Sequence, residues 1–245
     1  SFWNSTSYYT HEAINGIHSI INGNFHLIYH IINNTNNDEI PEMVTQRIIN
    51  GLLVIGGTIK DEYVLKLKDY GLPIVVVLTD IYNNEVNSVL ADFRYGAYTA
   101  TSHLIGLGHQ NIGFINGWAA THTSEMKLEG FKKALNENNL KFQEELYAMG
   151  NFTKESGKKI LKEFMKKDSA PSAIFTADDL MAIGAIEGCK ELGIKVPDDV
   201  SLIGFGNSPL SPEICPPLTT IDVPKYKIGQ IAAKRLINLM ETEDD

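Results

Sequence analysis

Residues 172–221 read SAIFTADDLMAIGAIEGCKELGIKVPDDVSLIGFGNSPLSPEICPPLTTI. A short apolar run at 173–175 is followed by a helical pattern over 180–192, and a second apolar run occupies 200–205. This order predicts a strand, a helix and a second strand, which requires parallel strands joined by a right-handed crossover. Both strands then end at the same edge of the sheet, where open α/β sheets bind their ligands.

Polar residues follow both strands. Asp178 and Asp179 come after the first strand, and Gly206-Asn207 comes after the second. An aspartate that begins a helix accepts backbone N–H bonds as a cap, but only one of the two can be the cap. Gly-Asn is also typical of a turn. We therefore expect Asp179 to be structural, and for Asn207 both a turn and a ligand contact stay open.

The same alternation fills the rest of the chain. Helical patterns are expected at 9–22, 38–50, 61–70, 95–105, 124–136, 154–166 and 226–240, and strands at 25–32, 52–55, 74–78, 112–115 and 146–149. Such alternation predicts an α/β fold with parallel sheets flanked by helices. There are too many units for one small sheet, so we expect two lobes.

The composition excludes several classes of protein. The 245 residues carry a formal net charge of −9 and no Lys/Arg-rich run, so the chain is not expected to bind nucleic acid by itself. No apolar run approaches the length of a membrane span, and no signal peptide is visible. Cys189 and Cys215 form neither a disulfide framework nor a metal-ligand pattern, which is compatible with a reducing cytoplasm.

Motifs for catalysis and cofactors are missing. A dinucleotide site needs GxGxxG after the first strand. Gly106-Leu-Gly108 meets Asn111 at the third position, and Gly204-Phe-Gly206 meets Pro209. The sequence contains no P-loop, no GxSxG elbow and no clustered Cys/His set. We therefore expect no enzyme, no cofactor and no metal site.

Several pieces resemble one family. FTADDLMAIGA, VPDDVSLIGF and PPLTTID, with the upstream HLIGLGH and IGFINGW, are similar to the effector-binding domain of the LacI/GalR family of bacterial transcriptional regulators. The resemblance implies two Rossmann-like lobes of the periplasmic-binding-protein type. The N-terminal lobe would comprise 1–109 plus 223–245, and the C-terminal lobe 110–222. A DNA-binding helix-turn-helix domain would precede Ser1.

The resemblance also implies ligand-binding positions in a cleft between the lobes. Asp178 matches a position that hydrogen-bonds ligand, and Lys127 replaces an arginine that forks onto ligand oxygens, which a lysine cannot reproduce. The alternative for Lys127 is an exposed helix lysine. Phe152 matches an aromatic that stacks on the ligand, with core packing as the alternative. Gly206 stands where the family commonly has an aspartate that holds a sugar hydroxyl.

Further candidates follow from the same resemblance. Tyr8 and Tyr9 open the first helix, and Trp118 and His122 lie in the loop after FING, at the edge of the expected cleft. Trp118 suggests a platform for a sugar, with loop packing as the alternative. Asp92 matches a common family aspartate, although it is also a plausible helix cap.

The predicted function is therefore a ligand-sensing domain of a cytoplasmic, homodimeric transcriptional regulator. A sugar or sugar phosphate would bind between the lobes and control operator binding through the DNA-binding domain. Residues 38–50 and Leu180-Met181 are candidate dimer surfaces by analogy. The alternative is an exported sugar-binding protein of a transport system, and within the family the partner could instead be a phosphorylated carrier protein.

Overall fold

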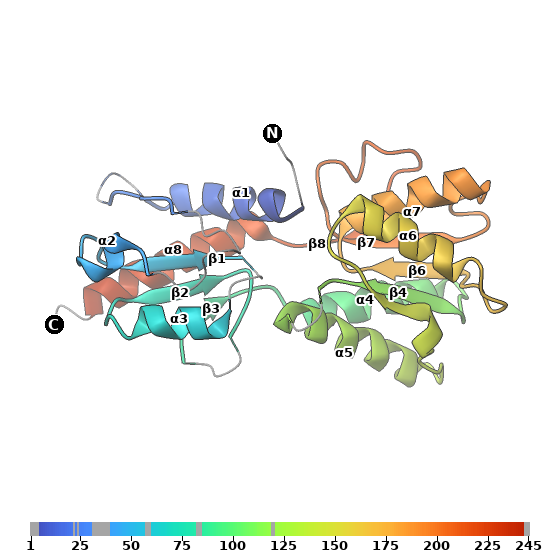
Figure 1. Ribbon diagram of the computed structural model, residues 1–245, viewed down its shortest axis with the longest axis horizontal. Helices are drawn as coiled ribbons and strands as arrows, with labels where there is room; N and C mark the ends of the chain where they lie inside the picture. Colours follow the sequence, from blue (N-terminus) through green and yellow to red (C-terminus); the bar gives the residue numbers. More distant parts are fainter. Residues whose placement is uncertain are drawn as a thin grey trace. The chain divides into compact units, whose positions relative to one another are not determined.

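The computed structural model describes residues 5–21, 23, 25–30, 40–56, 60–81, 85–118 and 121–242, with side chains from residue 10 onward. The chain forms two compact units. The larger comprises Asp92–Val223 together with residues up to Tyr8, and the smaller comprises Tyr9–Ala91 and the chain from Pro224 onward. The fold is the predicted α/β fold, with two parallel sheets flanked by helices (Figure 1).

The smaller unit is built on a three-stranded parallel sheet. Its strands β1 (Leu52–Ile55), β2 (Ile74–Val77) and β3 (Asn87–Val89) pair in that order. The helices of this unit are α2 (Glu42–Thr45), α3 (Asp61–Lys68), α8 (Lys225–Thr242) and α1 (Ser5–His18) from Tyr9 onward. The last helix returns from the far end of the sequence to pack on all three strands. The smaller unit is therefore discontinuous in sequence.

The larger unit holds a five-stranded parallel sheet in the order β5-β4-β6-β7-β8. Its strands are β4 (Ile112–Asn116), β5 (Tyr147–Met149), β6 (Ala173–Thr176), β7 (Ser201–Gly206) and β8 (Thr219–Asp222). The helices α4 (Phe93–Gly106) and α5 (His122–Glu137) lie on one face, and α6 (Lys154–Phe164) and α7 (Asp179–Leu192) lie on the other (Figure 1). A short 3-10 turn, Glu144–Leu146, leads into β5.

Two predicted elements differ from the structure. Residues 25–30 form no strand, and 31–32 lie outside the described residues. Ile28 and Tyr29 are each 55% exposed, so this apolar run is not buried in a sheet. The helix expected at 38–50 is reduced in the described chain to α2, which begins after Pro41. Apolar composition alone overestimated both elements.

The division into units lies at Ala91/Asp92, whereas the predicted boundary was His109. The difference is one helix, because α4 packs on α5 and contacts β6, β7 and β8 of the larger sheet. The chain re-enters the smaller unit at Val223/Pro224. The sequence placed the boundary just before the strand 112–116 and so assigned α4 to the wrong unit. The apolar pattern of a helix does not indicate which of two sheets the helix covers.

The residues suggested as dimer surfaces are partly core. Val44 and Met181 are fully buried, while Ile40 and Met43 pack partly buried against the core of the smaller unit. Ile48 is 61% exposed. Across the described residues, every helix falls short of the length and apolar character needed to cross a bilayer.

Glycines allow α6 and α7 to pack backbone against backbone. A Cβ on Gly157 would lie 2.1 Å from the carbonyl oxygen of Met181, and a Cβ on Gly184 would lie 1.9 Å from that of Lys154. Both distances are far below van der Waals contact, so any side chain at either position must push the helices apart. This close pairing brings the amino-terminal halves of α6 and α7 together.

We predict that Gly184→Ala destabilises the larger unit by about 2 kcal/mol or more, since overpacking against a backbone carbonyl cannot be relieved by a rotamer change. Gly106→Ala is the matched control, because nothing lies within 4 Å of a Cβ there and the residue is helical. Removing a helical glycine at an open position stabilises by a few tenths to about 1 kcal/mol. Urea unfolding of both variants measures the difference, and equal stabilities would contradict the packing argument.

Candidate ligand site at the carboxyl edge of the larger sheet

The carboxyl ends of β4, β6 and β7 each carry one of the candidate residues. These strands run parallel with paired registers, so the residues that follow them come out at one edge of the sheet. Trp118 follows β4, Asp178 follows β6, and Asn207 follows β7. Helix α5 begins after the same β4 loop and carries Lys127. All these elements belong to the larger unit.

Lys127 is the centre of the site and is only 5% exposed, which rules out an exposed helix lysine. Its Nζ donates a hydrogen bond of 2.9 Å to the carbonyl oxygen of Ala177, at the end of β6. The ammonium also lies over three aromatic rings, 4.5 Å from the centroid of Phe205, 5.2 Å from Phe93 and 6.0 Å from Phe152. A cation over ring faces is stabilised by their quadrupoles.

Burial lowers the pKa of Lys127 from its ordinary value to about 8, while the charges of Asp178 and Asp179 act in the opposite direction. The ammonium therefore still predominates at neutral pH. The site has a positive charge that is largely removed from water, and such a charge is costly unless compensated.

The two aspartates have different structural roles. Asp178 is 4% exposed and caps α7, its Oδ1 accepting from the N–H of Met181 at 2.8 Å. Asp179 is 2% exposed and accepts from the N–H of Ser208 at 2.6 Å and from two hydroxyls, Ser211 at 2.8 Å and Thr220 at 2.5 Å. Asp179 thus fixes the loop after β7, in agreement with its expected structural role.

Phe152 and Trp118 form an aromatic pair next to the lysine. Their ring centroids lie 6.0 Å apart at 61°, an edge-to-face contact. Trp118 is 36% exposed, and Phe152 is half-buried with a left-handed φ of 61°. A Cβ on Gly117 would lie 2.2 Å from the Phe152 ring, so a glycine is required for this approach. The structure therefore brings Trp118, Phe152, Lys127 and Asp178 together.

The other predicted residues are less closely joined to this centre. Asp92 caps α4 by accepting from the N–H of Tyr95 at 2.9 Å, and it is exposed. Asn207 has a φ of 50°, and its side chain donates to Asp222 at 3.1 Å, so it belongs to an exposed turn. His122 is the first residue of α5. The side chains of Tyr8 and Tyr9 lie outside the described residues.

Sequence reasoning missed two members of the site, Phe93 and Phe205. Phe93 follows the cap Asp92 and is 3% exposed, and Phe205 is 1% exposed near the end of β7. Their rings lie 5.8 Å apart and form one wall of the cage around Lys127. The sequence did offer one indication. Phe93 directly follows Asp92 and Phe205 directly precedes Gly206, and both neighbours were already assigned to the expected ligand edge.

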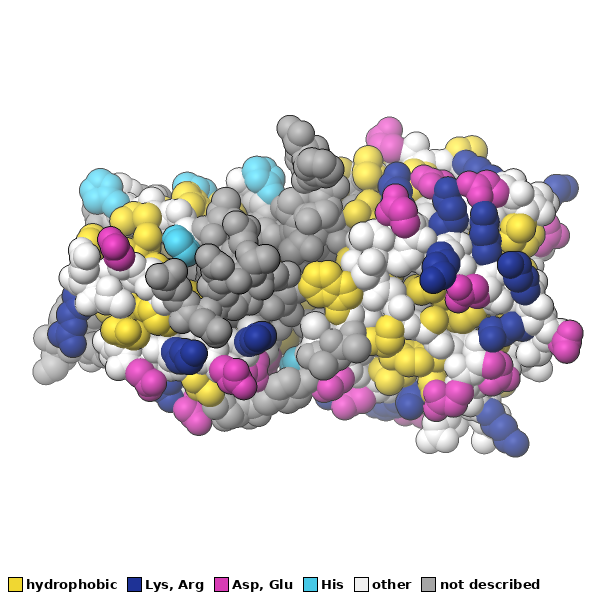
Figure 2. Space-filling model, viewed as in Figure 1, with side chains coloured by type: hydrophobic (Ala, Val, Ile, Leu, Met, Phe, Trp, Pro, Cys, Tyr) yellow, Lys and Arg dark blue, Asp and Glu magenta, His cyan; other side chains and the backbone are white. Residues whose placement is uncertain are grey.

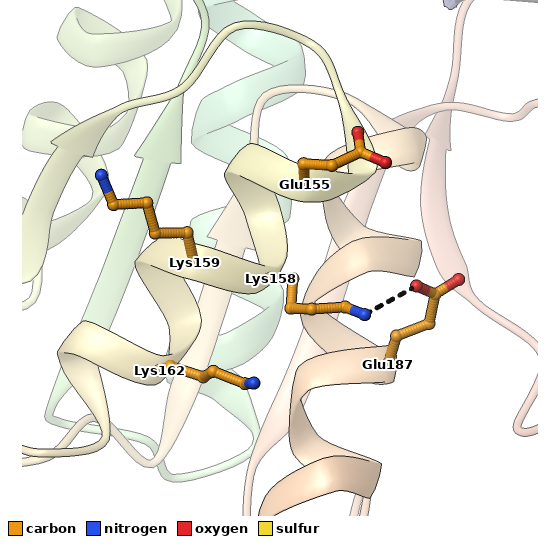
Figure 3. A pocket seen from close by; sticks show the side chains of 5 residues that line it. All are labelled: Glu155, Lys158, Lys159, Lys162 and Glu187. Carbon is orange, nitrogen blue, oxygen red and sulfur yellow. Dashed lines mark ion pairs between the residues drawn. The ribbon is translucent and has the colours of Figure 1, made fainter.

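A separate groove lies on the outer face of α6 and α7, where lysines gather among glutamates (Figure 2). It is lined by Glu155, Lys158, Lys159, Lys162 and Glu187, and Figure 3 shows Lys158 turned toward Glu187. Lys158 also pairs with Glu191 at 2.8 Å. The opposite charges in these ion pairs at the surface neutralise one another. Over the residues that the structure describes, no group of three or more His, Cys, Asp or Glu could hold a metal ion.

Comparisons with known proteins identify related sequences. Residues 101–245 match the periplasmic binding protein-like domain family. The chain is 33% identical over 196 residues to catabolite control protein A of Priestia megaterium, covering 80% of this chain and 59% of that protein. It is 35% identical over 198 residues to the HTH-type transcriptional repressor PurR of Photorhabdus laumondii, covering 80% and 58%. The chain thus spans about three fifths of the length of these relatives.

Solved structures agree with the sequence relatives. A putative transcriptional regulator LacI from Bacillus cereus subsp. cytotoxis superposes with a TM-score of 0.90 at 29% identity, covering 97% of this chain and 86% of that one. A LacI family transcriptional regulator from Enterococcus faecium, with bound ribose, superposes with a TM-score of 0.83 at 26% identity, covering 97% and 87%.

We predict that Lys127→Met changes the pH dependence of stability. The folded state lowers the pKa of Lys127 from 10.5 to about 8. Below about pH 8 both folded and unfolded states hold the proton, so the wild type bears the full cost of burial. Between about pH 8 and 10.5 the folded state releases its proton first, so wild-type stability rises relative to the methionine variant, by on the order of 3 kcal/mol in total. Urea unfolding of both proteins at pH 7 and pH 10 measures this, and a constant difference would contradict it.

We also predict that Asp179→Asn loosens the loop between β7 and β8. The substitution removes the charge that three donors share and costs about 2 kcal/mol or more, since hydrogen bonds to charged groups are the stronger ones. Limited proteolysis followed by mass mapping should show faster cleavage within residues 209–217. Asp198→Asn, at an exposed position, is the control. Unchanged cleavage in Asp179→Asn would show that the loop is held by other contacts.

Proposed function

Because the chain belongs to the LacI family of transcriptional regulators, with the periplasmic-binding-protein-like fold of their effector domains, we propose that it senses a small, sugar-like effector. The observation that carries the proposal is the buried Lys127 ammonium, held among three aromatic rings at the carboxyl edge of a parallel sheet. Ligands of open α/β sheets bind at this edge.

The chemistry of the site suits a small polar ligand with an apolar face. Trp118 and Phe152 offer ring faces and edges against which the C–H face of a sugar packs. Lys127 donates hydrogen bonds, and Asp178 supplies a buried carboxylate at the end of β6. Asp92, His122 and Asn207 are proposed peripheral contacts, and Tyr8 and Tyr9 are proposed from the family resemblance.

The proposed response is a change in how the two units are oriented. The chain passes between the units at Tyr8/Tyr9, Ala91/Asp92 and Val223/Pro224. A ligand that contacts both units favours the orientation in which both sets of contacts exist. In the whole protein, a homodimer in the cytoplasm, this shift would alter how two DNA-binding domains meet a palindromic operator. The names of two relatives support this proposal. Both proteins are longer than this chain, and they are called catabolite control protein A and the HTH-type transcriptional repressor PurR.

The second candidate is an exported sugar-binding protein. The observation in its favour is that the matching family is described as periplasmic binding protein-like. The sequence encoded before Ser1 separates the two, because a regulator carries a helix-turn-helix there and an exported protein carries a signal peptide. Within the regulator proposal, a phosphorylated carrier protein remains the alternative partner.

We predict that titration calorimetry against a panel of sugars and sugar phosphates finds a ligand with a dissociation constant in the micromolar range. Trp118→Ala should weaken that binding by about three- to tenfold, which corresponds to one aromatic contact. Tyr95→Ala is the matched control, since Tyr95 is a 66%-exposed aromatic of the same unit outside the site. Absence of heat with every member of the panel would overturn the proposed function.

A further inference from the structure

We infer that the effector carries an anionic group, a carboxylate or a phosphate, which pairs with the ammonium of Lys127. The inference rests on the proposed function and narrows the ligand from a polar molecule to an anion. The charge around the buried ammonium of Lys127 is what points to an anion. Binding of an anion would also be accompanied by proton uptake, which binding of a neutral ligand would not.

The ammonium of Lys127 is incompletely compensated. It has three N–H donors, and one of them binds the carbonyl of Ala177. The rings of Phe93, Phe152 and Phe205 attract the cation but have no lone pairs to accept its remaining hydrogen bonds. In the described part of the larger unit, no carboxylate oxygen forms an ion pair with Lys127, whereas partly exposed lysines of α6 do form them.

The two nearest carboxylates act on Lys127 only at longer range. Asp178 holds the first turn of α7, and Asp179 accepts from a backbone N–H and two hydroxyls. Moving either one toward the lysine would release a helix cap or the loop after β7. The structure therefore keeps both carboxylates in other roles while retaining a buried positive charge beside them.

A purely structural residue at this position would not need a charge. The surroundings are three phenylalanine rings, which a methionine or leucine would fill without desolvating an ammonium. Buried charges persist where a partner of opposite charge compensates them. An anion on the ligand supplies that partner, and the pair Trp118 and Phe152 beside it receives the apolar part of the same ligand.

Pairing with an anion also changes the protonation of Lys127. Its pKa in the protein is about 8, and an adjacent anion raises it. At pH 8 the binding of an anion therefore takes up about half a proton per site, and at pH 6.5 it takes up almost none. The titratable groups whose charges act on Lys127 are Asp178 and Asp179. The elements α4 and β7 and the loop at residue 152 face it with phenylalanines, which do not titrate.

The experiment is calorimetry of the protein with matched sets of probes. Each set contains a neutral aldose, the uronate with the same ring and the corresponding sugar phosphate. We expect one anionic probe to bind at least tenfold more tightly than its neutral counterpart. Titrations at pH 8 in buffers of different ionisation enthalpy should show the proton uptake, which should disappear at pH 6.5. The uronate and phosphate arms tell which of the two anions the site prefers.

Three variants locate the effect. Lys127→Met should abolish both the preference for the anion and the proton uptake. Lys132→Met is the matched control, since Lys132 also lies over a ring, 4.2 Å from Phe142, on the exposed side of the same helix. Lys127→Arg should keep the preference for the anion but lose the proton uptake, because a guanidinium does not titrate. Circular dichroism checks that each variant is folded. If Lys127→Met is unfolded, Lys127→Arg still tests the inference, because it should keep the preference for the anion and lose the proton uptake.

The outcomes separate this inference from the proposed function. A neutral aldose that binds as tightly as its anionic counterparts would overturn the anionic effector and leave the sensor intact. The same holds if an anion binds without proton uptake at pH 8, or if Lys127→Met keeps the preference. Absence of binding by every probe would overturn both.

Discussion

The parallel pairing of β4, β6 and β7 is the constraint on which the larger unit depends. Strands that run in the same direction need helical crossovers, and their carboxyl ends must emerge at one edge. That edge receives Trp118 from the loop after β4, Asp178 from the end of β6 and Phe205 from β7. The crossover helix α5 returns Lys127 to the same place. No single strand could assemble these side chains.

The hydrogen bond from Lys127 to Ala177 ties helix α5 to the end of β6. Helix α5 follows β4 in the chain, and Ala177 directly follows β6. The three rings around the ammonium come from α4, β7 and the loop after β5, so the cage draws on most of the unit. Burial lowers the pKa of this ammonium, so the cage holds a charge at a cost to the stability of the larger unit. That cost is the reason for proposing that a ligand compensates the charge.

The pair Asp178-Asp179 shows how adjacent, identical residues divide their roles. The strand ends before Asp178, whose extended backbone directs its carboxylate to the first turn of α7. Asp179 is already helical and points to the loop between β7 and β8. The close approach of α6 and α7 at Gly157 and Gly184 fixes where that first turn lies. The packing of α6 on α7 thus helps to place the capping carboxylate of Asp178.

The sequence by itself determined the alternation of strands and helices in the larger unit, because short apolar runs and the helical period of 3.6 are local properties. It also predicted the cap at Asp92 and a cap within the pair Asp178-Asp179, because a cap binds an N–H three residues away. Which of the two aspartates is the cap was decided by the structure. Prediction failed where burial depends on residues far away in the sequence. Residues 25–30 have the pattern of a strand but lie mostly exposed. Helix α4 packs on the larger sheet and not on the smaller one. Only the tertiary structure brought Phe93, Lys127 and Phe205 together, because contacts across tens of residues leave no periodic trace in a single sequence.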